Sequence, residues 1–445
     1  MSSTANKAVV VGLGKTGLSA ARYLHANGWQ VAVTDSRAAP PELPALRAQL
    51  PDVAVYCGAL RNELVRDAAM VVASPGLSLQ LPIFAAARAA GCQILGDVEL
   101  FARAVTTPVV GITGTNGKST VTTLLGQMAL RAGLRVAMGG NLGTPALELL
   151  GDTTVQLHVL ELSSFQLESV HSLKLAAATV LNVTPDHMDR YVSADDYAAA
   201  KRRIFANAAI AVLNVDDERV AAMARAGQRT LTFSIRLGHS ADFHLLQRER
   251  GECWLANSGT PLLNVALMKI SGLHNAANAL AALALGTAID LPAASMLETL
   301  KEFPGLPHRA QWVAEKRGVR FVNDSKGTNV GATLAAVAGF FGPLIVIAGG
   351  DGKGQDFRPL ATAFRGKVRH TILIGRDAAA IELALEGVCA TERCTSLETA
   401  VSAAARVARA GDTVLLSPAC ASLDMFRDYA HRGMVYSAAV AELAA

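Results

Sequence analysis

The chain is poor in aromatic side chains and in charge of either sign. Aromatic residues make up 5% of its 445 residues and charged residues 18%, whereas 51% are hydrophobic. This composition excludes a disordered or fibrous chain and is typical of a globular protein. The net charge is only +4, and the basic residues occur in short clusters among acidic neighbours, so we expect no nucleic-acid partner.

The sequence also lacks Cys-x-x-Cys pairs and an uninterrupted apolar run long enough to cross a membrane. The six cysteines include no Cys-x-x-Cys pair and no metal-like spacing with histidine, which indicates a reducing compartment. The first residues lack the charged start and apolar core of a signal peptide, so we expect a cytoplasmic protein. The uncharged run 330–350 is broken by Gly339 to Pro343, which predicts a helix and a strand and no membrane insertion.

Short apolar runs alternate with Ala- and Leu-rich segments along the chain, a pattern that predicts parallel sheets covered by helices. The length exceeds what one core supports. We therefore predict a monomeric α/β protein of three domains: Rossmann-like over 1–97, P-loop ATPase-like with a parallel sheet over 98–305, and Rossmann-like over 306–445. Strands are expected at residues 8–11, 30–33, 70–73, 109–110, 155–160, 178–183, 320–322, 344–347, 371–374 and 413–416.

Residues 111–120 form a glycine-rich stretch between an apolar run and a helical pattern. Its glycines let backbone N–H groups approach phosphate oxygens, Lys118 can reach the β- and γ-phosphates, and Ser119 or Thr120 can offer a hydroxyl to Mg²⁺. A strict Walker pattern would need glycine where Ile112 stands. The stretch predicts a site for ATP or GTP; the alternative is an ordinary glycine turn with a surface lysine.

A second glycine pattern, Gly12-x-Gly14-x-x-Gly17, is followed by Asp35 in the spacing of the dinucleotide fingerprint. Taken alone it predicts NAD and a dehydrogenase. Lys15-Thr16 between the glycines and Ser36-Arg37 after the acid also suit a different nucleotide or diphosphate. A tight turn without any ligand remains a third interpretation.

Three polar residues of the central region can serve a nucleotide site. Glu161 ends an apolar strand, where open α/β sheets bind ligands, and is either an Mg²⁺ ligand or a solvated carboxylate. His187 stands among ionisable residues and can bind metal or substrate or cap a turn. Lys201 lies in a helical pattern and, from its residue type, is expected to be exposed.

Three polar loops of the C-terminal region, 323–329, 349–354 and 417–424, each follow an expected strand. They should line one rim of the sheet, where a polar cluster suits an anionic small molecule; the alternative is three unrelated surface turns. The cluster consists of Lys326, Thr328, Lys353 and Ser422.

Five motifs together resemble the Mur ligases over nearly the whole chain. They are Gly114-Thr115-Asn116-Gly117-Lys118-Ser119, the Glu161 context Glu-Leu-Ser-Ser-Phe-Gln-Leu, Asp186-His187-Met188-Asp189-Arg190, His274-Asn275-Ala276-Ala277-Asn278 and Gly305-Leu306-Pro307-His308-Arg309. Within that family, the loops 324–329 and 417–424 and the opening glycine motif are similar to those of the members that join D-glutamate to UDP-N-acetylmuramoyl-L-alanine.

The resemblance implies an ATP-dependent amide ligase of cytoplasmic peptidoglycan precursor synthesis, working through an acyl phosphate. The N-terminal domain would then hold the UDP end of a sugar nucleotide instead of NAD. Another amide ligase of the superfamily, of the folylpolyglutamate synthase type, is the nearest alternative.

The resemblance also assigns site residues. It implies UDP-sugar binding by Gly14, Lys15, Thr16, Asp35, Ser36, Arg37, Gly76 and Asn141. It implies ATP binding by Gly114, Thr115, Asn116, Gly117, Lys118, Ser119, Thr120, Asn275, Arg309 and Asp324. It implies D-glutamate binding by Lys326, Thr328, Lys353, Ser422, Leu423 and Tyr429, the last where the family has phenylalanine.

Catalysis and metal binding follow from the same resemblance. The implied catalytic residues are Lys118, Glu161, His187, Lys201 and Lys326. Two Mg²⁺ sites are implied among Ser119, Glu161, His187 and Lys201. Lys201 matches a lysine that CO₂ carbamylates, which would turn a cation that repels Mg²⁺ into an oxygen ligand.

Overall fold

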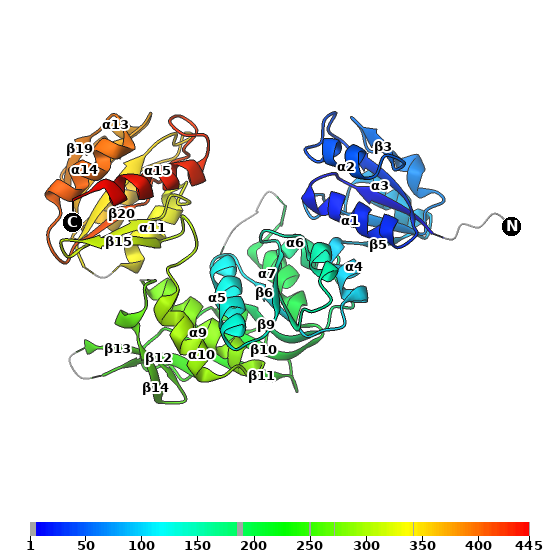
Figure 1. Ribbon diagram of the computed structural model, residues 1–445, viewed down its shortest axis with the longest axis horizontal. Coiled ribbons are helices and arrows are strands. Elements are labelled where there is room, and N and C mark those ends of the chain that lie inside the picture. Colours follow the sequence, from blue (N-terminus) through cyan, green and yellow to red (C-terminus); the bar gives the residue numbers. More distant parts are fainter. Residues whose placement is uncertain (1–5, 185–189, 249–250, 271, 341, 445) are drawn as a thin grey trace. The chain divides into compact units, whose positions relative to one another are not determined.

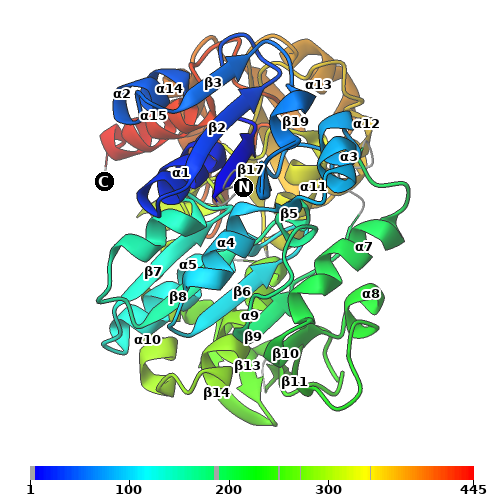
Figure 2. The same ribbon diagram turned by 90° about the vertical axis from the view of Figure 1, so that its right-hand side faces the viewer.

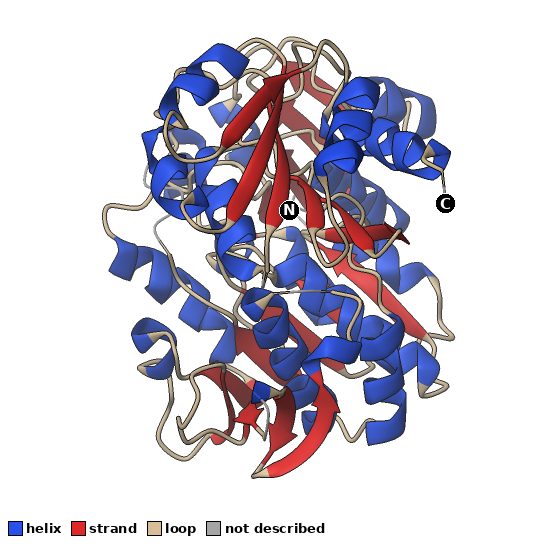
Figure 3. Cartoon of the chain, turned by 90° about the vertical axis from the view of Figure 1, so that its left-hand side faces the viewer, coloured by secondary structure: helices blue, strands red, loops and turns tan. Residues whose placement is uncertain are grey.

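The computed structural model describes residues 6–184, 190–248, 251–270, 272–340 and 342–444, and within them the strands form three sheets (Figure 1). His187 lies outside the described residues. The first sheet and most of the second belong to one compact unit, residues 1–246 with 256–260 and 278–297, and the third belongs to the other. Helices flank the strands of the sheets (Figure 3).

The first sheet is parallel, in the order β3-β2-β1-β4-β5. Its central strand is buried on both faces, since Ala8 and Val10 pack into one core and Val9 and Val11 into another. The strands are β1 (Lys7–Val11), β2 (Gln30–Asp35), β3 (Ala54–Cys57), β4 (Met70–Ala73) and β5 (Gln93–Leu95), and the helices are α1 (Lys15–Ala26), α2 (Leu43–Gln49) and α3 (Pro82–Ala89).

The second sheet has the order β14-β13-β12-β11-β10-β9-β6-β8-β7, and Figure 2 shows its strands β7, β8, β6 and β9 side by side. The strands are β6 (Val109–Thr113), β7 (Val136–Gly140), β8 (Leu157–Glu161), β9 (Leu175–Val180), β10 (Ala208–Asn214), β11 (Arg229–Ser234), β12 (Phe243–Gln247), β13 (Cys253–Asn257) and β14 (Thr260–Asn264). The helices are α4 (Asp97–Ala104), α5 (Lys118–Arg131), α6 (Ser164–Leu167), α7 (Ala194–Arg202), α8 (Glu218–Ala221), α9 (Leu273–Ala288) and α10 (Ala293–Glu302).

The third sheet has the order β15-β16-β20-β17-β18-β19. Along its central strand, Leu344, Val346 and Ala348 pack on one face and Ile345 and Ile347 on the other. The strands are β15 (Gln311–Lys316), β16 (Val319–Asn323), β17 (Leu344–Gly349), β18 (Val368–Ile374), β19 (Ala390–Arg393) and β20 (Thr413–Leu416), and the helices are α11 (Val330–Gly339), α12 (Arg358–Phe364), α13 (Ala378–Ala384), α14 (Leu397–Val407) and α15 (Tyr429–Glu442).

The α/β prediction is confirmed, but its strands need correction: the strand expected at 155–160 spans Leu157–Glu161, and β7 and β10 to β14 of the second sheet were not expected. The strand expected at 178–183 spans Leu175–Val180, and β15 runs antiparallel to β16, so the third sheet is not wholly parallel. The uncharged run 330–350 contains α11 and β17 as predicted. Among the described residues, no helix combines the length and apolar character that crossing a bilayer requires.

Asp97 opens α4 as a buried carboxyl, and we predict that it makes stability depend on pH. Its side chain accepts a hydrogen bond from Gln166, but burial is the larger effect and raises its pKa from 3.8 to about 6. Between these values the folded chain holds a proton that the unfolded chain has released. The contribution of this group to stability is therefore lost as pH rises through that window, by about 3 kcal/mol in total.

The variant Asp97→Asn removes this titration while retaining an oxygen that can accept from Gln166. Thermal unfolding between pH 4 and pH 7 should show a smaller loss of stability with rising pH in the variant than in the parent chain. Equal pH slopes in the two proteins would contradict the assignment.

Candidate active site

The glycine-rich stretch has the geometry of a phosphate loop. Gly114 and Gly117 take the positive φ angles 153° and 84°, and Gly117 is the N-cap of α5, so the N–H groups of the first helical turn face the loop. A Cβ on Gly117 would lie 2.4 Å from Oδ1 of Asn278. Only glycine fits there without displacing that amide.

Lys118 folds back over this loop. Its Nζ donates to the carbonyl oxygens of Gly114 and Thr115, each at 2.8 Å. The loop is anchored by Asn182, which follows β9: its Oδ1 accepts from Asn116 N at 2.8 Å and its carbonyl accepts from Thr115 N at 2.9 Å. The ammonium therefore lies beside the helix N-terminus, where a phosphate would bind.

Glu161 ends β8 next to the phosphate loop and is only 3% exposed. Its Oε2 accepts from Ser119 Oγ at 2.8 Å and its Oε1 accepts from Asn141 Nδ2 at 2.6 Å. The carboxylate and the hydroxyl are both hard oxygen donors of the kind that Mg²⁺ prefers. The interpretation of Glu161 as a solvated carboxylate is wrong, because the side chain is buried and hydrogen-bonded.

Lys201 is buried, which corrects the expectation of an exposed lysine drawn from its residue type. It is 1% exposed, its Nζ donates to Gly114 O at 2.9 Å, and it lies 4.3 Å from the ring centroid of Tyr197. Helix α7, which carries it, is capped by Ser193, whose hydroxyl accepts from Asp196 N. The fold thus brings an amine from α7 to the phosphate loop.

Helix α9 contributes Asn278, which lies in the motif 274–278 but was given no role from the sequence. Asn275 and Asn278, both mostly buried, stand three residues apart and so share one face of the helix. Asn278 is the residue that covers Gly117. In the sequence, the three-residue spacing of these two amides was the signal that could have identified Asn278. Among the residues that the structure describes, no group of three or more His, Cys, Asp or Glu side chains gathers as a metal site.

The N-terminal glycine motif forms a tight turn between β1 and α1. A Cβ on Gly17 would lie 2.0 Å from the carbonyl oxygen of Gly12, and Ser74 Oγ donates to that same oxygen at 2.9 Å. The turn that follows β4 and carries Gly76 is therefore tied to the glycine motif. Gly14 is the N-cap of α1, and Lys15 and Thr16 are its first residues.

Asp35 is engaged by protein donors at the end of β2. It accepts from Leu13 N at 2.7 Å and from the Arg37 guanidinium at 2.9 and 2.7 Å. Burial opposes ionisation, but the hydrogen bonds from Arg37 and Leu13 outweigh it and hold the pKa of Asp35 below its ordinary value. A ribose hydroxyl bound at Asp35, as in NAD sites, would compete with these donors. Ser36 and Arg37 remain exposed beside it.

The three C-terminal loops meet at one edge of their sheet, as predicted. Asp351 and Ala421 exchange two backbone hydrogen bonds, and Ser417 Oγ donates to Asp324 Oδ2 at 2.8 Å. The loops follow β16, β17 and β20, which are neighbours in the sheet. The interpretation as three unrelated turns is therefore wrong.

Arg432 of α15 joins two of these loops and was missed by the sequence analysis. It is fully buried and donates to Ser325 O at 2.9 Å and to Cys420 O at 3.1 Å. Burial raises the pKa of neighbouring Asp324 to about 6, although the hydrogen bond from Ser417 opposes that shift. An arginine inside a helix of mostly small and apolar residues was the available signal.

The remaining C-terminal candidates differ in their surroundings. The Lys326 Nζ lies 3.8 Å from the ring centroid of Tyr429, so the two face each other. Ser422 is buried, whereas Lys353, Leu423 and Arg309 are exposed, and Thr328 is partly buried.

Models of known protein families match three successive parts of the chain. The Mur ligase MurD-like N-terminal domain matches residues 6–96, the Mur ligase middle domain residues 112–286, and the Mur ligase glutamate ligase domain residues 308–420.

Curated relatives match along the whole chain. Proteins named UDP-N-acetylmuramoylalanine–D-glutamate ligase from Nitrosococcus oceani, Methylobacillus flagellatus and Pseudomonas aeruginosa are 50%, 51% and 50% identical to it. Each alignment covers 98% of this chain and 96%, 96% and 98% of the relative, respectively.

Solved structures share the fold. UDP-N-acetylmuramate-alanine ligase MurC from Thermotoga maritima matches with a TM-score of 0.58 at 18% identity, covering 98% of this chain and 99% of that one. A pseudomurein peptide ligase type C from Methanothermus fervidus matches with a TM-score of 0.56 at 19% identity, covering 93% and 96%.

Proposed function

The chain belongs to the Mur ligase family, and we propose that it is the ATP-dependent ligase that joins D-glutamate to UDP-N-acetylmuramoyl-L-alanine in peptidoglycan precursor synthesis. The observation that carries the proposal is the phosphate loop, whose Ser119 hydroxyl donates a hydrogen bond to the carboxylate of Glu161 at the end of β8. The names of the curated relatives support this choice of substrates. The proposal includes a cytoplasmic, monomeric enzyme with domains at 1–97, 98–305 and 306–445.

In this proposal the three substrates are held by residues of all three domains. The glycine motif, Asp35, Ser36, Arg37 and the turn at Gly76 hold the UDP group, with Asn141 nearer the sugar. The phosphate loop, Asn275, Arg309 and Asp324 hold ATP. D-Glutamate is received by Lys326, Thr328, Lys353, Ser422, Leu423 and Tyr429.

The proposed reaction has two steps, because a free carboxylate is a poor acceptor for an amine. First, a carboxylate oxygen of the alanyl group bonds to the γ-phosphorus of ATP while the bond to the β–γ bridging oxygen breaks, giving an acyl phosphate and ADP. Lys118 offsets the negative charge on the transferring group. The amine of D-glutamate then attacks the acyl carbon, inorganic phosphate leaves, and the amine loses a proton as the amide forms.

The described donors at the phosphate loop fit Mg²⁺. Ser119 and Glu161 supply hydroxyl and carboxylate oxygens, and we propose that His187 and Lys201 complete two sites. When bound, Mg²⁺ would neutralise phosphate charge during the transfer. Ser119 and Asn141 each donate a hydrogen bond to one oxygen of Glu161, which holds the carboxylate beside the loop.

Phosphate release by the purified protein tests the function directly. We expect release only when ATP, UDP-N-acetylmuramoyl-L-alanine and D-glutamate are all present, with one new amide formed for each phosphate. Turnover with a pteridine substrate in place of the sugar nucleotide, or reduction of NAD, would instead favour the alternatives raised by the sequence. If no phosphate were released with the complete mixture, the proposed function would be refuted.

A further inference from the structure

We propose that Arg190 is a positioning residue that links the nucleotide-sugar turn at Pro75 to Lys201 at the phosphate loop. The inference rests on the proposed function, since it assigns the two ends of the link to the sugar-nucleotide and ATP sites. All the contacts that support it lie within the compact unit that contains the first sheet and most of the second.

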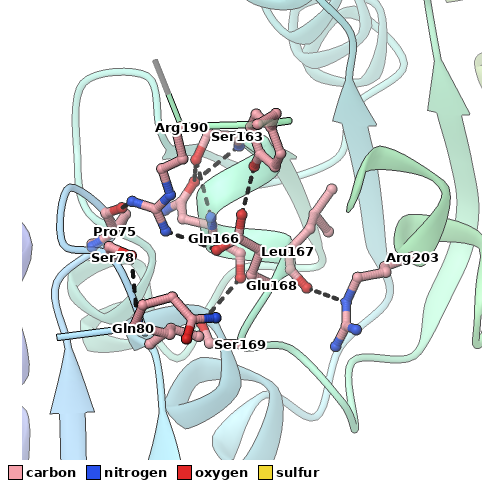
Figure 4. Close-up of polar contacts among 12 residues, drawn as sticks. Pro75, Ser78, Gln80, Ser163, Gln166, Leu167, Glu168, Ser169, Arg190 and Arg203 are labelled. Atoms are coloured by element: carbon pink, nitrogen blue, oxygen red, sulfur yellow. Dashed lines mark hydrogen bonds and ion pairs between the residues drawn. The ribbon is translucent and has the colours of Figure 1, made fainter. Parts of the chain in front are cut away.

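Arg190 makes three contacts at once, and Figure 4 shows the two polar ones. Its Nη2 forms an ion pair with Glu168 Oε2 at 2.7 Å, and its Nη1 donates to the Pro75 carbonyl at 3.4 Å. Its Cζ lies 4.4 Å from the ring centroid of Phe165. The side chain is only 15% exposed, so water screens the pair less than it would at the surface. A planar guanidinium suits such simultaneous contacts, because it can stack on a ring while donating at its edge.

Packed aromatic side chains connect the surroundings of Arg190 to Lys201 at the phosphate loop. Tyr191 donates to Glu168 Oε1 at 2.6 Å, stacks on Phe165 and packs 5.2 Å from the Tyr197 ring. Tyr197 in turn faces the Lys201 ammonium, which donates to Gly114 O. Displacing Arg190 would therefore disturb a continuous set of packed groups that ends at Lys201.

The segment that Arg190 contacts, Phe165 to Glu168, is held in place by its connection to β8. Phe165 belongs to α6, which begins three residues after the end of β8 with a capping box between Ser163 and Gln166. Glu168 directly follows this helix. Arg190 thus ties the turn after β4 to a segment whose position is set by the strand of Glu161.

The variant Arg190→Gln tests the proposal, with Arg203→Gln as its matched control. Arg203 holds the same segment by donating to Leu167 O at 2.7 Å (Figure 4) and to Val170 O at 3.2 Å. Among the described residues it forms no hydrogen bond or ion pair with Glu168 or Pro75. We expect Arg190→Gln to raise KM for the sugar nucleotide about tenfold or more and to lower kcat similarly. KM for D-glutamate should stay within about twofold of the parent value in both variants.

Two further variants separate positioning from folding. Arg190→Lys keeps the charge without the planar fork and should recover part of the loss, while Glu168→Gln, which removes the shared acceptor charge, should resemble Arg190→Gln. We expect Arg203→Gln to leave KM for the sugar nucleotide and kcat close to the parent values. If Arg190→Gln also left both kinetic constants unchanged, whatever its melting temperature, the link would be refuted. A parent chain that released no phosphate would refute the proposed function instead.

Discussion

Replacing Lys118 with alanine is expected to lower kcat by about 10³-fold or more while leaving sugar-nucleotide binding intact. The ammonium donates to two carbonyls of its own loop, so it is held beside the N-terminus of α5, where the γ-phosphate would carry its charge. Removing it takes away stabilisation that grows as the phosphoryl group transfers. Steady-state kinetics with calorimetric binding of UDP-N-acetylmuramoyl-L-alanine measures both quantities.

Lys174→Ala provides the control for the loss of a positive charge. Lys174 is an exposed lysine immediately before β9, in the same compact unit. Its variant should retain the parent rate. Unchanged turnover in Lys118→Ala would remove the phosphate loop from the mechanism.

The fold could be predicted because its signals are local. Runs such as Val9 to Val11 and Leu344 to Ile347 are apolar without alternation, which is what burial on both faces of a parallel sheet requires. The short edge strands β3, β5 and β19 mix polar and apolar residues. Edge strand β15 runs antiparallel to its neighbour β16. Their positions depend on neighbours distant in the sequence, so no local pattern indicated them.

The site was predictable where glycine or a strand end fixes the geometry. The phosphate loop and Glu161 are of this kind. Lys201 is not, because its burial arises from packing against Tyr197 and from a contact 87 residues away, with Gly114. Residue type alone therefore predicted an exposed lysine. Arg432 was missed for the same reason, since its partners lie on two loops that only the tertiary fold brings together.

Lys201→Ala is expected to lower Mg²⁺-dependent kcat by about 10²-fold or more, and the cause we propose is loss of a carbamate. A lysine that is 1% exposed is costly to keep charged, and its ammonium lies beside a site proposed to bind a divalent cation. The neutral amine can bond to the carbon of CO₂ and release a proton, which replaces a positive charge by a carboxylate-like group. In the proposed metal sites, Ser119 and Glu161 would then share their metal with a third oxygen donor.

Carbon-13 NMR of protein equilibrated with labelled bicarbonate measures the carbamate itself. We expect one carbamate carbonyl signal in the parent and in Lys118→Ala, because both retain the amine of Lys201. We expect no such signal in Lys201→Ala. Lys201→Arg should be as inactive as the alanine variant, because a guanidinium keeps the positive charge and does not form the carbamate under these conditions. A parent protein without the signal would refute the carbamate. An active Lys201→Arg enzyme would show that a cation suffices at this position, and the role of Lys201 would then be to hold Gly114 and the phosphate loop in place.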